Sequence, residues 1–243
     1  MKEKKLADDF ENFRYERKFV LSELTSQEIE RIIRCHPANF KEIFYERTIN
    51  NIYFDSLDLK NYHDHLSGNV ERFKIRIRWY GKIFGEIKNP VIEIKAKKNE
   101  LGKKTSFPIK NFVLDEKFSL EYIQKIFSQS NVPFWLSEEL KLYMPVILNS
   151  YKRNYFSSND KRYRLTIDKE VKFYEIRSRN NLFFRKYKDV DNIIIELKYQ
   201  LKDFEKAKEI TEHFPFRLGA YSKYITGINL LDLWVLLVPA LRQ

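Results

Sequence analysis

Basic side chains occupy every second position of the segment between Val70 and Tyr80. They are Arg72, Lys74, Arg76 and Arg78. Successive residues of a β-strand point to opposite faces, so this segment is predicted to be a strand with one cationic and one apolar face. Like charges at this spacing repel each other, and an anion is therefore expected on the cationic face. Arginine suits phosphate because its planar guanidinium donates two hydrogen bonds to phosphate oxygens and stays charged.

The same period of two recurs in five further segments, which are predicted to be strands over 14–20, 50–55, 91–97, 162–169 and 193–199. Any one of these polar faces would ordinarily be a solvent-exposed face. Taken together, however, they carry more basic than acidic residues. The basic residues are Arg14, Lys18, Arg72, Lys74, Arg76, Arg78, Lys95, Lys97, Arg162, Arg164 and Lys198, and the acidic ones are Glu16, Glu93, Asp168 and Glu196. Carboxylates hold Mg²⁺ or Mn²⁺, which in turn bridges phosphates, so the pattern indicates a combined metal and phosphate site.

The composition favours one ordered, β-rich domain with an anionic partner. The chain has 243 residues, with 45 Lys and Arg against 34 Asp and Glu, a net charge of +11 and a pI near 9.4. This charge predicts nucleic acid, a phosphate compound or an acidic membrane surface as the partner. The chain is rich in aromatic residues and poor in Gly and Pro, as is typical of packed β-proteins. No linker divides the chain, so we expect a single domain over residues 1–243.

Two features bear on the location of the protein. Cys35 is the one cysteine, which excludes an intramolecular disulfide, and the first ten residues contain no apolar core resembling a signal peptide, so a cytoplasmic location is expected. The most apolar stretch, 228–241, is interrupted by Asp232 and Pro239 and is shorter than the ~20 residues of a membrane-spanning helix. We therefore expect no transmembrane segment and an apolar C-terminal helix or tail over 230–243. Docking of this tail on a membrane protein or a membrane surface is the alternative.

Helix signals lie between the predicted strands. Thr25 and Glu28 have the spacing of a capping box, which predicts a helix to about Cys35. Further helices are predicted over 119–128, 137–143 and 203–213, and Ser222 would cap a last one. Polar loops are predicted over 98–106 and 157–161. Asp55, at the end of a strand, is predicted to be a structural hydrogen-bond acceptor rather than a metal ligand.

A sheet with one apolar and one charged face can be an open platform or can close on itself. Closure would bring the cations together in a narrow volume and let the helices cover the apolar outer face. We therefore predict an α+β fold: a closed antiparallel β-barrel with helices packed on the outside and an inner wall of Arg and Lys. Single-stranded nucleic acid would need exposed aromatic rings, whereas the aromatic residues here mostly alternate onto the apolar face, so nucleic acid is disfavoured.

Eight motifs, in order and with their spacing, resemble the VTC domain, the vacuolar transporter chaperone type of polyphosphate polymerase in the triphosphate tunnel metalloenzyme superfamily. The resemblance covers residues 12–229 or so. The motifs are RYERKFVL, NNIYFDS, RFKIRIRWYG, VIEIKAKK, NSYKRNYF, RYRLTID, IIIELKY and YSKYITGI. The resemblance implies a tunnel in which basic residues grip linked phosphates and a carboxylate near the floor holds Mn²⁺ or Mg²⁺.

Carried over motif by motif, the resemblance implies phosphate contacts from seven residues and a metal ligand at Glu196. The seven are Lys18, Arg76, Arg78, Lys95, Arg153, Arg164 and Lys223. We expect the four arginines of this set to neutralise the charge that develops in the transition state of phosphoryl transfer. They are Arg76, Arg78, Arg153 and Arg164. The remaining phosphate-binding candidates are Lys18, Arg72, Lys74, Lys95, Lys198 and Lys223, and Glu16 and Glu93 are further candidate metal ligands.

The chain departs from the family pattern at two positions. His65 falls near a position that is often basic in the family, and Ala220 stands three residues before Lys223, where Lys is frequent. Arg72, Lys74 or Arg217 is available to compensate.

Three functions follow as alternatives. The first is transfer of the γ-phosphoryl group of ATP to a growing polyphosphate chain, and the second is hydrolysis of triphosphate or a nucleoside triphosphate. The third is a non-catalytic module that binds polyphosphate or nucleotide within a larger assembly. Arg14 stands where the triphosphatase branch carries the first acid of its Glu-x-Glu-x-Lys pattern, which disfavours a triphosphatase.

Overall fold

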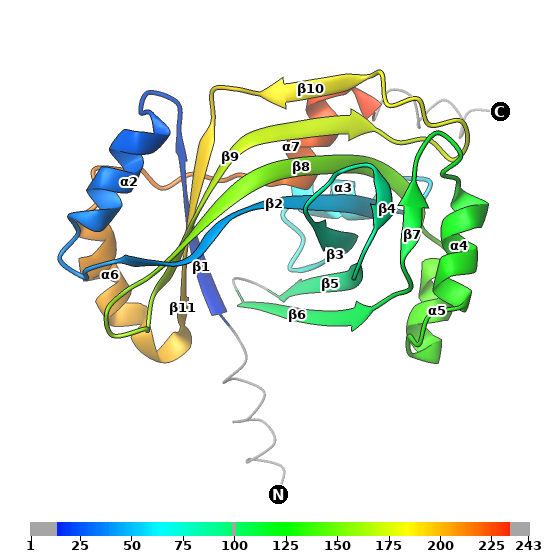
Figure 1. Cartoon of the computed structure of the whole chain (residues 1–243). Helices are drawn as coiled ribbons and strands as arrows, with labels where there is room; N and C mark the ends of the chain where they lie inside the picture. Colours follow the sequence, from blue (N-terminus) through cyan, green and yellow to red (C-terminus); the bar gives the residue numbers. More distant parts are fainter. Residues whose placement is uncertain (1–13, 99–100, 234–243) are drawn as a thin grey trace, which may run out of the picture.

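The computed structural model describes residues 14–98 and 101–233 (Figure 1). Its strands are β1 (Arg14–Leu21), β2 (Lys41–Asp55), β3 (Glu71–Tyr80), β4 (Gly85–Ile87), β5 (Val91–Lys98), β6 (Leu101–Pro108), β7 (Phe112–Leu114), β8 (Met144–Ser157), β9 (Arg164–Glu175), β10 (Lys186–Asp189) and β11 (Ile193–Gln200). Its helices are α2 (Ser26–Arg34), α3 (Lys60–Leu66), α4 (Leu120–Ser128), α5 (Phe134–Leu140), α6 (Phe204–Glu212) and α7 (Lys223–Leu230). The predicted α+β class is confirmed.

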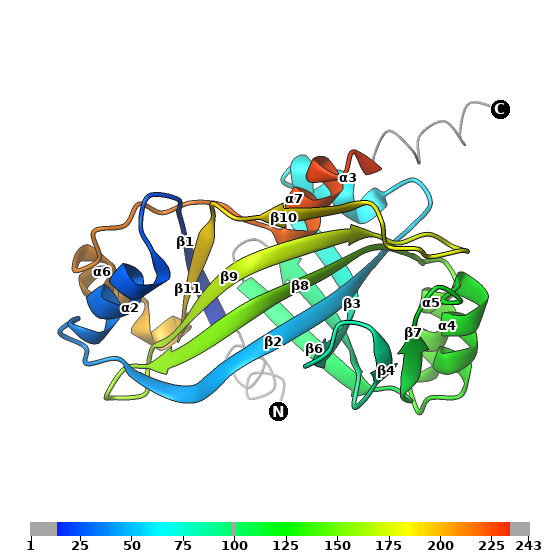
Figure 2. The same ribbon diagram turned by 45° about the horizontal axis from the view of Figure 1, so that its top comes forward.

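One antiparallel sheet of nine strands dominates the fold, in the order β10-β9-β11-β1-β6-β5-β3-β2-β8. β8, the last strand in this order, also pairs with β9, the second, so the sheet curves round on itself (Figure 2). Within the described residues, however, β1 and β6 are joined by the single pair Arg14 and Gly102. The sheet is thus strongly curved but incompletely joined between these two strands.

The prediction of a closed barrel is therefore wrong in that detail, and the backbone of β1 gives the reason. A connecting segment, Leu218–Gly219, takes the edge of β1 that a closed barrel would offer to β6. Phe19 forms a bridge with Leu218, and the Gly219 N–H donates to the Lys18 carbonyl at 2.9 Å. Because these edge groups already have partners, β1 and β6 separate beyond Arg14.

Helices cover the outer face of the curved sheet at two places, as predicted. Ile29 and Ile33 of α2, with Ala207 of α6, pack on buried side chains of β1, β9 and β11. Ile123 of α4 and Leu136 of α5 belong to a second core under β2, β3 and β5. The apolar half of each alternating strand thus faces a helical layer, which leaves the charged half on the inner face.

Helix α7 fills one end of the inner face. Tyr224 and Ile228 of this helix are buried with residues of β2, β8 and β9. Gly227 permits this close approach, because a Cβ there would lie 2.4 Å from Ile147 Cδ1 and 2.5 Å from Phe173 Cδ1. The N-terminus of α7 therefore points toward the charged part of the inner face.

Several local predictions are confirmed. Thr25 caps α2 with both bonds of the capping box, Ser119 caps α4 and Ser222 caps α7. Asp55 is a structural acceptor: its carboxylate accepts from the backbone N–H groups of Asn61 and Tyr62, each at 3.0 Å, and from the Tyr224 hydroxyl.

The predicted loop over 98–106 is wrong, because β6 begins at Leu101 and pairs with β5 along its length. Strand β8 was not predicted at all. The helix predicted over 137–143 lies earlier, as α5, and ends at Leu140. The predicted helix or tail over 230–243 falls largely on residues 234–243, which lie outside the described part. Within that part, no helix combines the length and apolar character needed to cross a membrane.

Candidate phosphate site on the inner face

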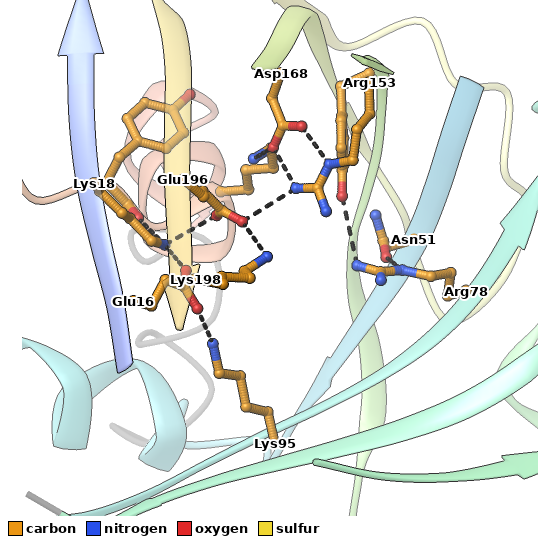
Figure 3. A network of polar contacts seen from close by, with 12 residues as sticks. Glu16, Lys18, Asn51, Arg78, Lys95, Arg153, Asp168, Glu196 and Lys198 are labelled. Carbon is orange, nitrogen blue, oxygen red and sulfur yellow. Dashed lines mark hydrogen bonds and ion pairs between the residues drawn. The ribbon is translucent and has the colours of Figure 1, made fainter. Parts of the chain in front are cut away.

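Side chains from β1, β3, β5, β6, β8, β9, β11 and α7 meet on the inner face as a network of two groups of ion pairs, which Tyr151 links by accepting from Arg78 and packing against Arg153. Figure 3 shows the group around Glu196 together with Arg78. We call this network the inner cluster. Its basic members are Lys18, Arg76, Arg78, Lys95, Lys104, Arg153, Lys198 and Lys223, and its carboxylates are Glu16, Glu93, Asp168 and Glu196. Strand alternation places these residues on one face, and the strand registers bring them together.

Glu196 of β11 lies at the centre of the inner cluster. Its carboxylate contacts the Lys198 ammonium at 2.7 Å, the Lys18 ammonium at 3.3 Å and the Arg153 guanidinium at 3.3 Å. Burial raises the pKa of Glu196, but the charges of Lys198, Lys18 and Arg153 outweigh it and hold the pKa well below its usual range. Glu196 is therefore an anion held by cations from three strands.

Asp168 of β9 lies next to this centre and is fully buried. Arg153 donates to both of its oxygens, at 2.5 and 2.6 Å, and Lys223 at the start of α7 donates to one of them. Burial raises the pKa of Asp168, but the charges of Arg153 and Lys223 outweigh this effect, so the pKa lies below its usual value. This carboxylate therefore fixes the positions of two basic residues from elements far apart in the sequence.

Glu16 of β1 reaches across the opening between β1 and β6 to a side chain of β5. It accepts from the Lys95 ammonium of β5 at 2.9 Å and contacts the Lys18 ammonium at 3.1 Å. Burial and the nearby Glu196 raise the pKa of Glu16, but Lys18, Lys198 and Lys95 bring it down to about 2. An ion pair thus spans the separation between β1 and β5.

Glu93 of β5 organises the arginines of β3. Arg76 donates to it at 2.7 and 2.9 Å, Lys104 of β6 donates at 2.8 Å, and Arg78 lies 3.5 Å away. Burial raises the pKa of Glu93, yet Arg76 and Arg78 lower it to about 2. Arg78 is held further by the Asn51 side-chain oxygen at 2.9 Å.

Lys74 of β3 is a basic residue without a carboxylate partner among the described residues. Its ammonium donates to the Ser222 hydroxyl, the N-cap of α7, at 2.8 Å. Burial and the positive charges of Lys18, Lys95 and Arg76 lower the pKa of Lys74 to about 7. An anion near Lys74 would relieve this repulsion.

Besides Lys74, two of the predicted residues stay outside the inner cluster. Arg164 lies opposite Lys198 in the sheet but is exposed, and it makes no hydrogen bond or ion pair within the described residues. Arg72 is half-buried, and its Nε is buried without a hydrogen-bond partner in that part of the chain. Both remain proposed phosphate contacts.

The two departures from the family pattern lie in different surroundings. His65 is on α3, and Ala220 is exposed in the connection before α7. Lys74 reaches the start of this helix from β3 through its contact with Ser222. A basic side chain is thus present beside Lys223 even though position 220 has none.

Some members of the inner cluster were not among the site residues predicted from the sequence. Asp168 and Lys104 are ion-paired in it, and Asn51 and Tyr151 contact Arg78. Alternation counted back from Arg153 would have put Tyr151 on the same face. Lys104 fell in the segment that was predicted to be a loop.

The carboxylates of β1 and β11 suit a divalent cation bound together with phosphate. The Lys18 ammonium contacts Glu16 at 3.1 Å and Glu196 at 3.3 Å, so one small cation can contact both. The Thr166 hydroxyl, opposite Glu196, is buried and has no hydrogen-bond partner among the described residues. That part of the chain contains no group of three His, Cys, Asp or Glu residues able to hold a metal alone. One or two carboxylates completed by phosphate oxygens is the usual arrangement for Mg²⁺.

Solved structures with a similar chain path have low sequence identity to this chain. A Vibrio parahaemolyticus protein named as a candidate adenylate cyclase is 9% identical, with a TM-score of 0.48, and the match covers 87% of this chain and 97% of that one. The PH1819 protein of Pyrococcus horikoshii is 14% identical, with a TM-score of 0.46 and coverage of 90% and 99%. The Mimivirus capping enzyme triphosphatase is 12% identical, with a TM-score of 0.35 and coverage of 88% and 93%. These values are too low to transfer an activity.

A search of curated proteins finds no match. The VTC domain, by contrast, matches residues 13–232, which is nearly the whole described part of the chain. The matched range contains every member of the inner cluster and agrees with the resemblance inferred from the motifs. The chain therefore belongs to the VTC domain family.

Proposed function

We propose that this protein transfers the γ-phosphoryl group of ATP to the end of a polyphosphate chain bound on its inner face. The observation that carries the proposal is the convergence of basic side chains from six strands and the start of α7 around four carboxylates. A chain of linked phosphates is an anion of small cross-section and high charge. Basic side chains that converge in this way can contact it from several sides.

The carboxylates of the inner cluster act as internal counter-anions in the free protein. Taking several like charges out of water is costly unless they are paired, and Glu16, Glu93, Asp168 and Glu196 supply that pairing. Incoming phosphate oxygens would share or replace these contacts at the more exposed ammonium groups, such as Lys95 and Lys104. The most buried pair, Arg153 with Asp168, would stay fixed and position the guanidinium.

The transfer itself needs no side-chain nucleophile. A terminal phosphate oxygen of the acceptor attacks the γ-phosphorus, the bond from that phosphorus to the bridging oxygen breaks, and ADP leaves with the electron pair. In this proposal Arg76, Arg78 and Arg153 neutralise the charge that builds on the transferring group, while Lys18, Lys198 and Lys223 align donor and acceptor. Glu196 and Glu16 would hold Mn²⁺ or Mg²⁺, which supplies further neutralisation when bound.

The test is to incubate the purified full chain with ATP and Mn²⁺ and to resolve the products by gel electrophoresis and phosphate release. Long phosphate chains together with ADP are expected. Free phosphate without chains would instead identify a hydrolase, and tight polyphosphate binding with neither product would identify a binding module.

Paired variants link the result to the inner cluster. Arg76→Ala and Glu196→Ala should each remove chain synthesis, because they take away a phosphate contact and the central carboxylate. Arg179→Ala is the matched control, since Arg179 is 76% exposed and pairs only with Glu121 in the described part of the structure. If the two cluster variants kept the activity of the control, the proposed site would be wrong.

A further inference from the structure

Arg47 of β2 is surrounded by three aromatic rings next to the inner cluster. Its guanidinium carbon lies 4.5 Å from the Phe44 ring centroid, 5.7 Å from that of Tyr80 and 5.7 Å from that of Tyr155. Phe44 and Tyr155 also pack edge to face, with centroids 5.7 Å apart. We call Phe44, Arg47, Tyr80 and Tyr155 the rim cluster.

A bulge in β2 brings Phe44 into this group. The register between β2 and β8 shifts on both sides of Phe44, so Phe44 lies opposite Tyr155 while Arg47 lies opposite Arg153. Such bulges redirect a side chain from one sheet face to the other. Tyr80 reaches the same face by ordinary alternation from Arg78 on β3. The rim cluster is therefore built from three neighbouring strands, and all its members share the inner face.

The rim cluster leaves flat aromatic surface uncovered. Phe44 is 47% and Tyr80 is 51% exposed. Arg47 is exposed as well and makes no hydrogen bond or ion pair with the described residues, although Glu46 beside it pairs with Lys152 and Lys169. A guanidinium held by rings alone, next to uncovered ring faces, is a surface that attracts another flat π-system.

The rim cluster continues directly from the inner cluster. Arg153, which binds Asp168 and Glu196, lies opposite Arg47 and two residues before Tyr155 on β8. Two residues of a strand span about 7 Å, so a ligand with phosphates at Arg153 need extend only a short way to reach the rings. A linear polyphosphate would not use such rings, whereas a nucleotide carries a base at the end of its phosphates.

We infer that the rim cluster is the site for the base of the nucleoside triphosphate donor. This inference rests on the proposed function, because it assumes that the phosphates of the donor lie on the inner cluster. Stacking on aromatic rings and on a guanidinium acts on the π-face that every base has. The rim cluster should therefore strengthen the binding of nucleotides relative to inorganic triphosphate of equal charge. It should discriminate little between ATP and GTP.

The experiment measures dissociation constants of ATP, GTP and inorganic tripolyphosphate by calorimetry, with the full chain and with EDTA present. The variants are Tyr80→Ala and the double variant Phe44→Ala with Tyr80→Ala. Each is expected to weaken ATP and GTP binding roughly 5- to 100-fold, the range that loss of base stacking produces, and to change tripolyphosphate binding by less than about twofold. Phe134→Ala, which removes an 80% exposed ring on α5, is the control and should change neither.

A third variant, Arg47→Gln, guards against loss of folding, since Arg47 is exposed and unpaired within the described residues. It should weaken nucleotide binding without weakening tripolyphosphate binding to the same extent. Equal effects on nucleotide and tripolyphosphate, or no effect on ATP, would overturn the rim assignment. Failure of the proposed function looks different: tripolyphosphate would not bind the wild type, or Arg76→Ala would not weaken its binding.

Discussion

Replacing Lys74 by arginine is expected to change how polyphosphate binding depends on pH. Lys74 has no carboxylate partner among the described residues, donates to the Ser222 hydroxyl, and lies near the charges of Lys18, Lys95 and Arg76. Its pKa of about 7 means that the free protein loses this proton as the pH rises through neutrality. A bound phosphate would restore a pKa closer to that of an ordinary lysine, so binding takes up a proton.

The sign and size of the effect follow from that pKa. Below pH 7 Lys74 is charged in the free protein, and binding involves no proton uptake. Above pH 7 each further pH unit should weaken binding up to tenfold, which gives about a 30-fold weaker affinity at pH 8.5 than at pH 6. Lys74→Arg should remove this dependence because a guanidinium stays charged throughout. Lys74→Met should bind weakly at every pH.

The assay is a titration of fixed-length polyphosphate into wild type and variants in the same set of buffers. Protonation of the ligand itself affects all proteins equally, so it cancels in the ratio of the dissociation constants of wild type and Lys74→Arg. If the two proteins gave parallel profiles from pH 6 to 8.5, then either Lys74 would keep its proton in the free protein or it would lie away from the bound phosphates. Both outcomes would refute the reasoning.

Three further outcomes are expected from changes in the fold and in the inner cluster. The pKa of Glu93 is about 2, below the value of 4.5 for a free glutamate, so its ion pairs stabilise the native state above pH 4.5 and lose that effect as the pH falls toward 2. The loss amounts to at most about 3 kcal/mol. In urea unfolding, the free energy of unfolding of Glu93→Gln should therefore depend less on pH over this range than that of wild type. Gly227→Ala would force a Cβ against Ile147, so the free energy of unfolding should fall by roughly 1–3 kcal/mol; a value equal to that of wild type would show that α7 can move away from β8 at no cost. Thr25→Ala removes the capping box of α2 and should cost about 1 kcal/mol while leaving polyphosphate affinity unchanged; reduced affinity would show that α2 influences the inner face.

Local sequence patterns were sufficient for the elements in which one face is apolar and the other polar. β3, β5 and β11 were predicted to within two residues of their observed ends, because strict alternation fixes both the strand and its faces. The capping box at Thr25 also depends on neighbouring residues only, as do the two bonds that Asp55 accepts from the backbone of Asn61 and Tyr62. The same alternation identified Lys18, Arg76, Arg78, Lys95 and Lys198, which the structure brings together on the inner face. Arg153 and Lys223 came from the resemblance to the family, and Lys104 was not predicted.

Strands without that pattern were missed for two opposite reasons. β8 is buried on both faces over most of its length, so its sequence shows no alternation. β6 is mostly polar and exposed where its side chains are described, and its backbone pairing with β5 holds it in the sheet. Neither condition can be recognised from the segment alone, since both depend on what packs beside it.

The sequence by itself thus determined which strands carry charge on one face, and this pattern carried the prediction of an anion-binding face. Only the tertiary structure decided how those charges are paired. Glu16 meets Lys95 and Asp168 meets Lys223 across 79 and 55 residues, and a bulge turns Phe44 toward Tyr155. The physical reason is that a period of two specifies the face of a residue, whereas its partners depend on register, bulges and strand order, which arise from contacts between distant segments.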